Sequence, residues 1–112
     1  MTDKLEFQNL VTELRRGSLT IAVLGCLKSP HYGYALLQTI QDYNIDIEAN
    51  TLYPLLRRLE KQELLKSDWD TSESRPRKFY VLSGKGQEAL EALTEEQNRM
   101  QESIQRIIGK EE

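Results

Sequence analysis

The chain has 112 residues, of which 38% are hydrophobic and 29% charged, a composition typical of one soluble globular domain. Its net charge of −3 argues against a polyanionic partner, but residues 73–86 carry +3 and residues 88–112 carry −4, and local clustering is what a phosphate-facing patch requires. Cys26 is the only cysteine and His31 the only histidine, which excludes an internal disulfide and a Cys/His metal cluster. We expect no cofactor. Because neither a transmembrane run nor a signal peptide is evident, we also expect a cytoplasmic protein without membrane contacts.

The first third of the chain predicts two helices. Apolar positions between residues 5 and 15 fit a short amphipathic helix, which Gly17 and Ser18 interrupt. Ser18 can cap a second helix over residues 19–28 that is apolar nearly all round and should hold Cys26 in the core. Pro30 follows, and the residue before a proline disfavours helical backbone.

The middle of the chain predicts two further helices. Residues 32–40 direct three apolar side chains inward, and alternation around Ile45 and Ile47 suggests a very short strand. A helix then follows from about Thr51, with leucines at 52, 55, 56 and 59 on one face. With Thr51 as N-cap, Pro54 falls in the first turn, where its missing N–H costs no hydrogen bond.

After residue 64 the hydrophobic period changes to two. Residues 65–70 and 78–82 alternate in polarity and flank the polar turn TSESRPR at 71–77, which predicts a β-hairpin with a basic tip. Ser83 can cap a final helix that runs to about Ile108. The sequence therefore predicts a mainly α protein with a small β-hairpin, namely a winged helix-turn-helix with an added N-terminal helix and a long C-terminal helix.

Three stretches resemble the PadR family of bacterial transcriptional regulators: YGY at 32–34, NTLYPLLRRLE at 50–60 and RPRKFYVLSGKG at 75–86. They occur in the family's order, and the short branch with one C-terminal helix is the better match. The resemblance implies a dimeric repressor that binds a palindromic operator, and it allows a small hydrophobic effector. The family commonly has glycine where Asn50 and Glu63 stand. Asn50 tolerates left-handed backbone, whereas Glu63 weakens the expected stop of the third helix.

Double-stranded DNA is the partner that the basic residues favour. A helix in the major groove uses its N-terminal residues and basic side chains on bases and phosphates, and a basic hairpin tip suits phosphate or a minor groove. Tyr34 could pack in the core while Tyr32 reaches a phosphate from the start of its helix, and for these two tyrosines packing and DNA contact are equally favoured. The residues that we expect at the DNA are Tyr32, Asn50, Thr51, Tyr53, Pro54, Arg57, Arg58, Arg75, Arg77 and Lys78.

The last helix predicts a homodimer. Its apolar positions are spaced three and four residues apart and form an apolar stripe, or seam, along one face of the helix. A helix of this length extends beyond so small a domain, so the seam needs a partner to cover it. The expected interface residues are Phe7, Leu10, Leu14, Leu90, Leu93, Gln97, Met100, Ile104 and Ile107. We assign residues 1–82 to the DNA-binding domain and 83–112 to the dimerisation helix, within one structural unit. Because residues 84–108 contain no aromatic side chain, we expect planar aromatic effectors to bind weakly, and we expect Trp69 to close the domain core.

One other class of function fits the predicted fold. A winged helix can act as a protein–protein interaction module without binding DNA, although such a module usually lacks a basic recognition helix and a basic wing together. No nucleophile, paired carboxylate or metal constellation accompanies His31, so we do not expect an enzyme. Binding to DNA that weakens steeply as salt rises separates the regulator from the interaction module.

Overall fold

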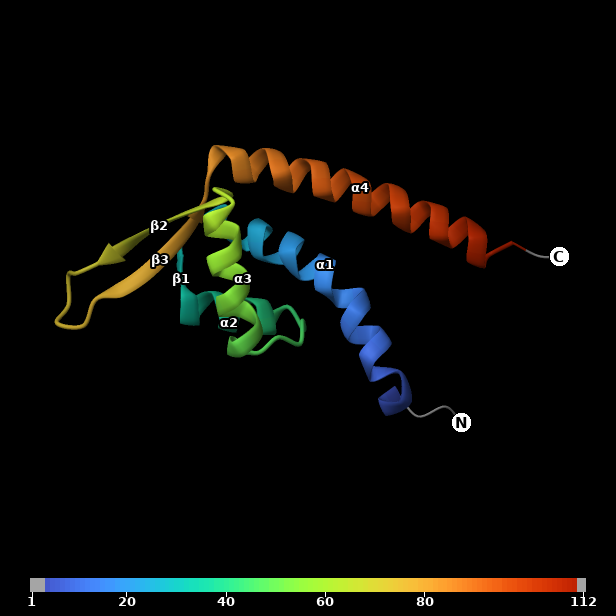
Figure 1. Ribbon diagram of the computed structural model, residues 1–112, viewed down its shortest axis with the longest axis horizontal. Coiled ribbons are helices and arrows are strands. Elements are labelled where there is room, and N and C mark those ends of the chain that lie inside the picture. The colour runs from blue at the N-terminus through green and yellow to red at the C-terminus, as the bar shows by residue number, and fades with distance from the viewer. Residues whose placement is uncertain (1–3, 111–112) are drawn as a thin grey trace.

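A computed structural model describes residues 4–110, with only the backbone described at residues 4 and 5 (Figure 1). Residues 1–3, which begin the expected DNA-binding domain, and residues 111–112, which end the expected dimerisation helix, lie outside the described residues. The helices and strands are η1 (Lys4–Phe7, a short 3-10 helix), α1 (Gln8–Cys26), β1 (His31–Tyr32), α2 (Gly33–Asp42), α3 (Ala49–Lys61), β2 (Leu65–Asp70), β3 (Arg77–Leu82) and α4 (Gly84–Ile108). This order and the antiparallel sheet β1-β3-β2 confirm the predicted winged helix-turn-helix.

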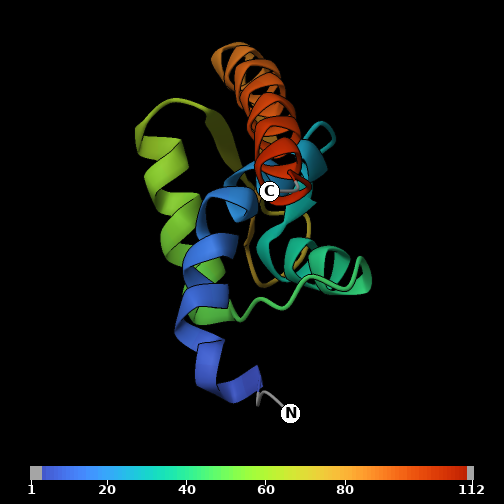
Figure 2. The same cartoon turned by 90° about the vertical axis from the view of Figure 1, so that its right-hand side faces the viewer.

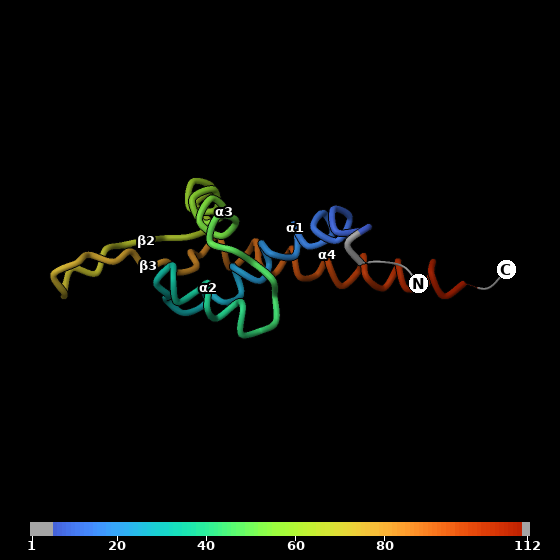
Figure 3. Tube along the Cα trace, turned by 90° about the horizontal axis from the view of Figure 1, so that it is seen from below, coloured from blue at the N-terminus to red at the C-terminus, as the bar shows by residue number. Residues whose placement is uncertain are grey.

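The core lies where α1, α2 and α3 meet the base of the sheet. Its fully buried side chains are aliphatic, because each helix turns one apolar face inward. They are Val23, Leu24, Leu27, Leu36, Ile40, Leu52, Leu56 and Leu59. In Figure 3, α2 and α3 lie on opposite sides of the β2–β3 hairpin, which extends away from this core as the wing.

The prediction of two separate N-terminal helices is wrong, because α1 is continuous through Gly17 and Ser18. A glycine within a helix costs only about 1 kcal/mol, and burial of Val23 and Leu24 further along α1 offsets that cost. Ser18 caps nothing; its hydroxyl donates instead to Gln97 Oε1 of α4 at 3.4 Å. Cys26 is half-buried rather than fully buried, and desolvation raises the pKa of its thiol.

The short strand is found at a different place from the one predicted. Ile45 and Ile47 turn toward the core, but their segment pairs with no strand among residues 4–110. Alternating apolar residues indicate which side chains are buried, but a strand also requires a neighbouring strand to which its backbone groups can hydrogen-bond. That neighbour exists for His31 and Tyr32, which pair antiparallel with Tyr80 and Phe79 of β3.

Helix α3 begins earlier than predicted, with Glu48 rather than Thr51 at the N-cap. Pro54 is therefore inside the helix and not in its first turn, and it has no N–H to donate to the carbonyl of Asn50 four residues before it. Asn50 is itself helical, so its tolerance of left-handed backbone plays no part.

The end of α3 depends on a strained residue. Glu63 has φ 67°, the left-handed conformation that favours glycine. Its N–H donates to the carbonyl of Glu60 at 2.9 Å, and the N–H of Leu64 donates to that of Leu59 at 3.0 Å. These two bonds form a Schellman motif, which stops the helix cleanly although glycine is missing.

Helix α4 follows the wing directly, and Ser83 caps it as predicted by accepting a hydrogen bond from the N–H of Gly86 at 2.9 Å. The helix is 25 residues long, and together with the wing at the opposite end it accounts for the chain's longest extent of 64 Å (Figure 1). Figures 1 and 2 show α1 and α4 diverging toward their free ends. No helix within residues 4–110 combines the length and hydropathy needed to cross a bilayer.

Candidate nucleic-acid interface

The outward face of α3 carries most of the residues expected at the DNA. Its four leucines are buried, which fixes the helix rotation and leaves the polar face in solvent. The exposed side chains on that face are Asn50, Thr51, Pro54, Arg57 and Arg58. Within the described part of the chain, neither Arg57 nor Arg58 is paired with an acid.

Tyr53 is the exception on this helix, because its ring is half-buried against α2. A Cβ added at Gly33 would lie 2.6 Å from Tyr53 Cε1. Only glycine therefore lets the tyrosine ring rest on the first residue of α2. This contact explains the glycine of the YGY stretch through packing, and it links the two helices of the helix-turn-helix.

The three expected wing bases have different surroundings. Arg75 is exposed at the tip and has no ion-pair partner among residues 4–110. Lys78 is half-buried, and its Nζ lies 3.3 Å from Glu60 Oε1 on α3. A hydrogen bond from Ser67, together with Lys78, lowers the pKa of Glu60. Lys78 thus joins the wing to the recognition helix.

Arg77 and Tyr32 belong to a compact cluster. The Tyr32 hydroxyl donates to Asp70 Oδ2, and the Arg77 guanidinium carbon lies 4.3 Å from the centroid of the Tyr32 ring. The ring of Tyr34 is stacked on that of Tyr32 with 5.9 Å between centroids. Hydrogen bonds from Ser72 and then from Tyr32 lower the pKa of Asp70 to about 2. Of the two roles left open for Tyr32, packing is the one seen here.

The expectation that Trp69 closes the core is wrong. Its side chain is 57% exposed and lies opposite Lys78 in the β2–β3 register, with Lys78 Nζ 6.0 Å from the ring centroid. Both residues face the same side of the hairpin. Asp70 was missed, because its signal is spatial proximity to Arg77 rather than spacing in the sequence. Tyr34, for which we allowed packing in the core, is 58% exposed and contacts Arg77 instead.

The residues expected at the dimer interface fall into two groups. Leu90 is 7% exposed and packs in the core of its own chain, so it has little surface left for a partner. The others remain exposed in the single chain: Phe7, Leu10, Leu14, Leu93, Gln97, Met100, Ile104 and Ile107.

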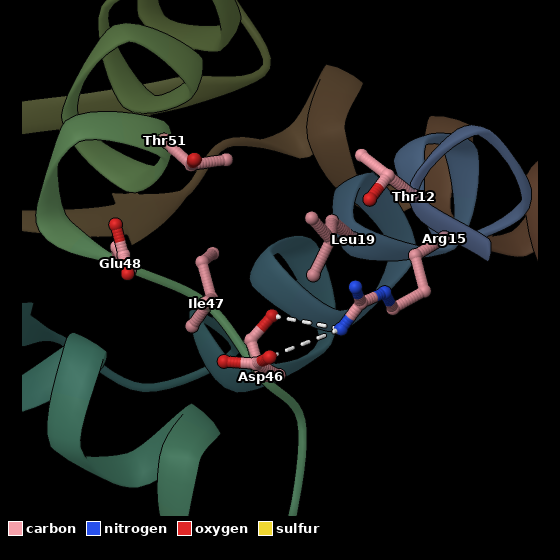
Figure 4. A pocket seen from close by; sticks show the side chains of 7 residues that line it. All are labelled: Thr12, Arg15, Leu19, Asp46, Ile47, Glu48 and Thr51. Atoms are coloured by element: carbon pink, nitrogen blue, oxygen red, sulfur yellow. Dashed lines mark hydrogen bonds and ion pairs between the residues drawn. The ribbon is translucent and has the colours of Figure 1, made fainter. Parts of the chain in front are cut away.

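A surface hollow lies between α1 and the start of α3 (Figure 4). Arg15 of α1 crosses it, with Nη1 donating to the Asp46 carbonyl at 3.4 Å and lying 3.6 Å from the Asp46 carboxylate. This contact attaches the N-terminal helix to the segment that leads into α3. Among the described residues no cluster of three His, Cys, Asp or Glu side chains suits a metal ion.

A family model agrees with this architecture. The transcriptional regulator PadR-like family matches residues 23–92, from the buried half of α1 through the start of α4. The "Transcriptional regulator Rv3488" of Mycobacterium tuberculosis is 31% identical over 78 residues, which is 70% of each chain. The chain therefore belongs to the PadR-like family, whose members are transcriptional regulators, and the resemblance inferred from the sequence is confirmed.

Solved structures extend the likeness to the whole fold. A PadR family transcriptional regulator from Eggerthella lenta is 41% identical and covers 96% of both chains with a TM-score of 0.91. A Bacillus subtilis PadR solved in complex with operator DNA is 21% identical and has a TM-score of 0.61 over 67% of this chain and 46% of its own. The second likeness concerns the fold alone.

Proposed function

We propose that this chain is a homodimeric repressor that binds a palindromic DNA operator through α3 and the wing. The observation that carries the proposal is the exposed, unpaired basic face of α3 beside a protruding basic hairpin. Residues 1–82 serve DNA binding in this proposal, and residues 83–112 serve dimerisation. The repressor role and DNA as the partner rest on membership of the PadR-like family of transcriptional regulators, and a PadR of the same fold has been solved in complex with operator DNA.

Helix α3 is the element that we place in the major groove. Arg57 is exposed at its middle, and Asn50 and Thr51 are exposed at its N-terminal end. Arginine reads guanine with two parallel hydrogen bonds, while asparagine and threonine suit adenine or phosphate. Tyr53 has less freedom than these, because Gly33 and its neighbours hold the ring. It therefore contributes its hydroxyl from a fixed position.

The test is equilibrium binding to a duplex from the region upstream of the protein's own gene, measured over a series of salt concentrations. Arg57→Ala should weaken binding by about 1–3 kcal/mol if it contacts a base. Arg99→Ala, which removes the same charge from an exposed site on α4, is the matched control and should bind almost normally. Salt-independent binding, or equal losses in the two variants, would refute sequence-specific recognition and favour a protein–protein module.

The dimer proposal rests on the apolar faces of α1 and α4. Leu10 and Leu14 are 61% and 77% exposed, and Ile107 is 73% exposed. A small chain rarely leaves so many large apolar side chains in water. A second copy, with its own α1 and α4, offers the same apolar faces and would cover the exposed side chains of the two diverging helices. The two copies of α3 would then lie about 34–36 Å apart, one DNA turn.

Sedimentation at micromolar concentration tests this assembly. The natural chain should sediment as a dimer, and Ile104→Asp, which places a charge in the seam, should sediment as a monomer. Glu95→Gln on the same helix is the control and should stay dimeric. A monomeric natural chain would refute the dimer.

Within the dimer we expect weak binding of planar aromatic dyes, because α4 offers aliphatic side chains and no ring on which a dye can stack.

A further inference from the structure

The wing is attached to the start of α2 by side chains from four elements. Tyr32 ends β1, Tyr34 belongs to the first turn of α2, and Asp70 and Arg77 close the β2–β3 ladder. We call these four residues the wing clamp. Its polar contacts are the hydrogen bond from Tyr32 to Asp70, the hydrogen bond from Arg77 Nη1 to the Tyr34 hydroxyl at 3.1 Å, and the 3.7 Å ion pair between Arg77 and Asp70.

The clamp lies where backbone pairing to the domain has already ended. Strand β1 contributes only two pairs to β3, and the outer one joins Tyr32 to Phe79. Asp70 and Arg77 are paired two residues further toward the tip, where only side chains can still connect the hairpin to the domain. A two-stranded hairpin without such support is marginally stable in water.

Arg77 has few groups left for a ligand. Its Nη1 donates to Tyr34 and its Nη2 lies 3.3 Å from Glu73 Oε1. Its Nε is fully buried and has no hydrogen-bond partner among the residues that the structure describes. The flat guanidinium also covers the Tyr32 ring, an arrangement that a lysine ammonium cannot reproduce. Arg75, two residues earlier, is exposed and unpaired within the described chain.

We propose that Arg77 is a positioning residue which, with Tyr32 and Asp70, holds the wing at a fixed angle to the helix-turn-helix, while Arg75 makes the phosphate contact. This proposal rests on the proposed function, since it divides the wing's role in DNA binding between the two arginines. The phosphate contact belongs to Arg75, which is exposed. The positioning role belongs to Arg77, which is half-buried and already bound to Tyr34 and Glu73.

Arg77→Lys is the discriminating variant, because it keeps the charge and loses the planar stacking. Affinity for the upstream duplex should fall roughly fivefold, with no change in the slope of log K against log salt. Arg75→Ala should instead reduce that slope by about one. Normal affinity in Arg77→Lys, together with a reduced slope in Arg77→Ala, would overturn the proposal by showing that Arg77 acts through its charge.

Tyr32→Phe removes the other half of the clamp. It should weaken binding by a similar factor, and the double variant with Arg77→Lys should be no weaker than either single one, because both changes release the same element. Tyr43→Phe, at a tyrosine that is 72% exposed elsewhere on the surface, is the control. Additive losses in the double variant would mean that Tyr32 and Arg77 act separately, and would overturn the clamp.

Hydrogen exchange of the free protein tests the clamp without DNA. Backbone amides of the β2–β3 ladder near the wing tip, at residues 68–70 and 77–79, should exchange several-fold faster in Tyr32→Phe and in Arg77→Lys than in the natural chain, while those of α3 stay unchanged. Equal exchange at the tip in all proteins would overturn the proposal. If the natural chain binds no DNA, the proposed function fails, yet this measurement still decides whether the clamp holds the wing.

Discussion

Replacing Glu63 by glycine should stabilise the protein. At φ 67° this residue bears a left-handed backbone, which costs a non-glycine residue about 1–2 kcal/mol. Glycine removes that cost but adds about 0.5–1 kcal/mol of backbone entropy to the unfolded chain. The exposed ion pair between Glu63 and Lys85, at 3.9 Å, contributes little. The net gain in unfolding free energy should therefore be about 0.5–1 kcal/mol, or roughly 2–4 °C in melting temperature.

Differential scanning calorimetry at one fixed protein concentration measures this gain, because dimerisation would otherwise shift the melting temperature. Glu63→Ala removes the same ion pair and keeps the backbone cost, so it should not stabilise. Asn44→Gly is the second control, since Asn44 has φ 65° but asparagine tolerates that region; its gain should be smaller. Equal stabilisation by Glu63→Ala would show that charge, and not backbone strain, is responsible.

Three other predictions follow from single contacts. Gly86→Ala should destabilise by more than about 2 kcal/mol in denaturant titrations, because its Cβ would meet the Leu64 carbonyl oxygen at 2.0 Å. Gly33→Ala should fold but bind the upstream duplex more weakly in a fluorescence titration, because the added methyl group must displace the Tyr53 ring. The Asp70 carboxyl should titrate by NMR near pH 2 instead of 3.8; because its pKa is depressed, its contribution to stability should be full above pH 4 and disappear toward pH 2.

Most of the fold could be predicted because periodicity reports burial. The four leucines of α3, the alternation in the hairpin and the Ser83 cap each depend on neighbours in the sequence, and those elements agree with the structure. The errors occurred where distant residues decide. Gly17 is a local break signal that burial further along α1 overrides, and β1 exists only because β3 offers it a partner 47 residues later at the pairing of Tyr32 with Phe79.

The candidate site was only partly predictable, for a related reason. Exposure of Arg57 and Arg75 follows from the local pattern of each element. The partners of Arg77 and Lys78 do not, because Tyr34 and Glu60 lie on different helices. A sequence pattern can therefore name the basic residues of a wing, but only the folded chain separates those that remain free from those already bound.

Nearby acidic side chains neutralise most of the positive charge of the wing, and this affects how the wing can contribute to DNA binding. The window 73–86 carries +3 in the sequence, yet two acids outside that window, Asp70 and Glu60, lie within ion-pair distance of Arg77 and Lys78. The field that a phosphate would meet at the wing is therefore closer to that of Arg75 alone. The exposed bases of α3 then supply most of the attraction, and the wing contributes more through its position than through its charge. On this reasoning, loss of Arg57 should weaken binding more than loss of any single wing base.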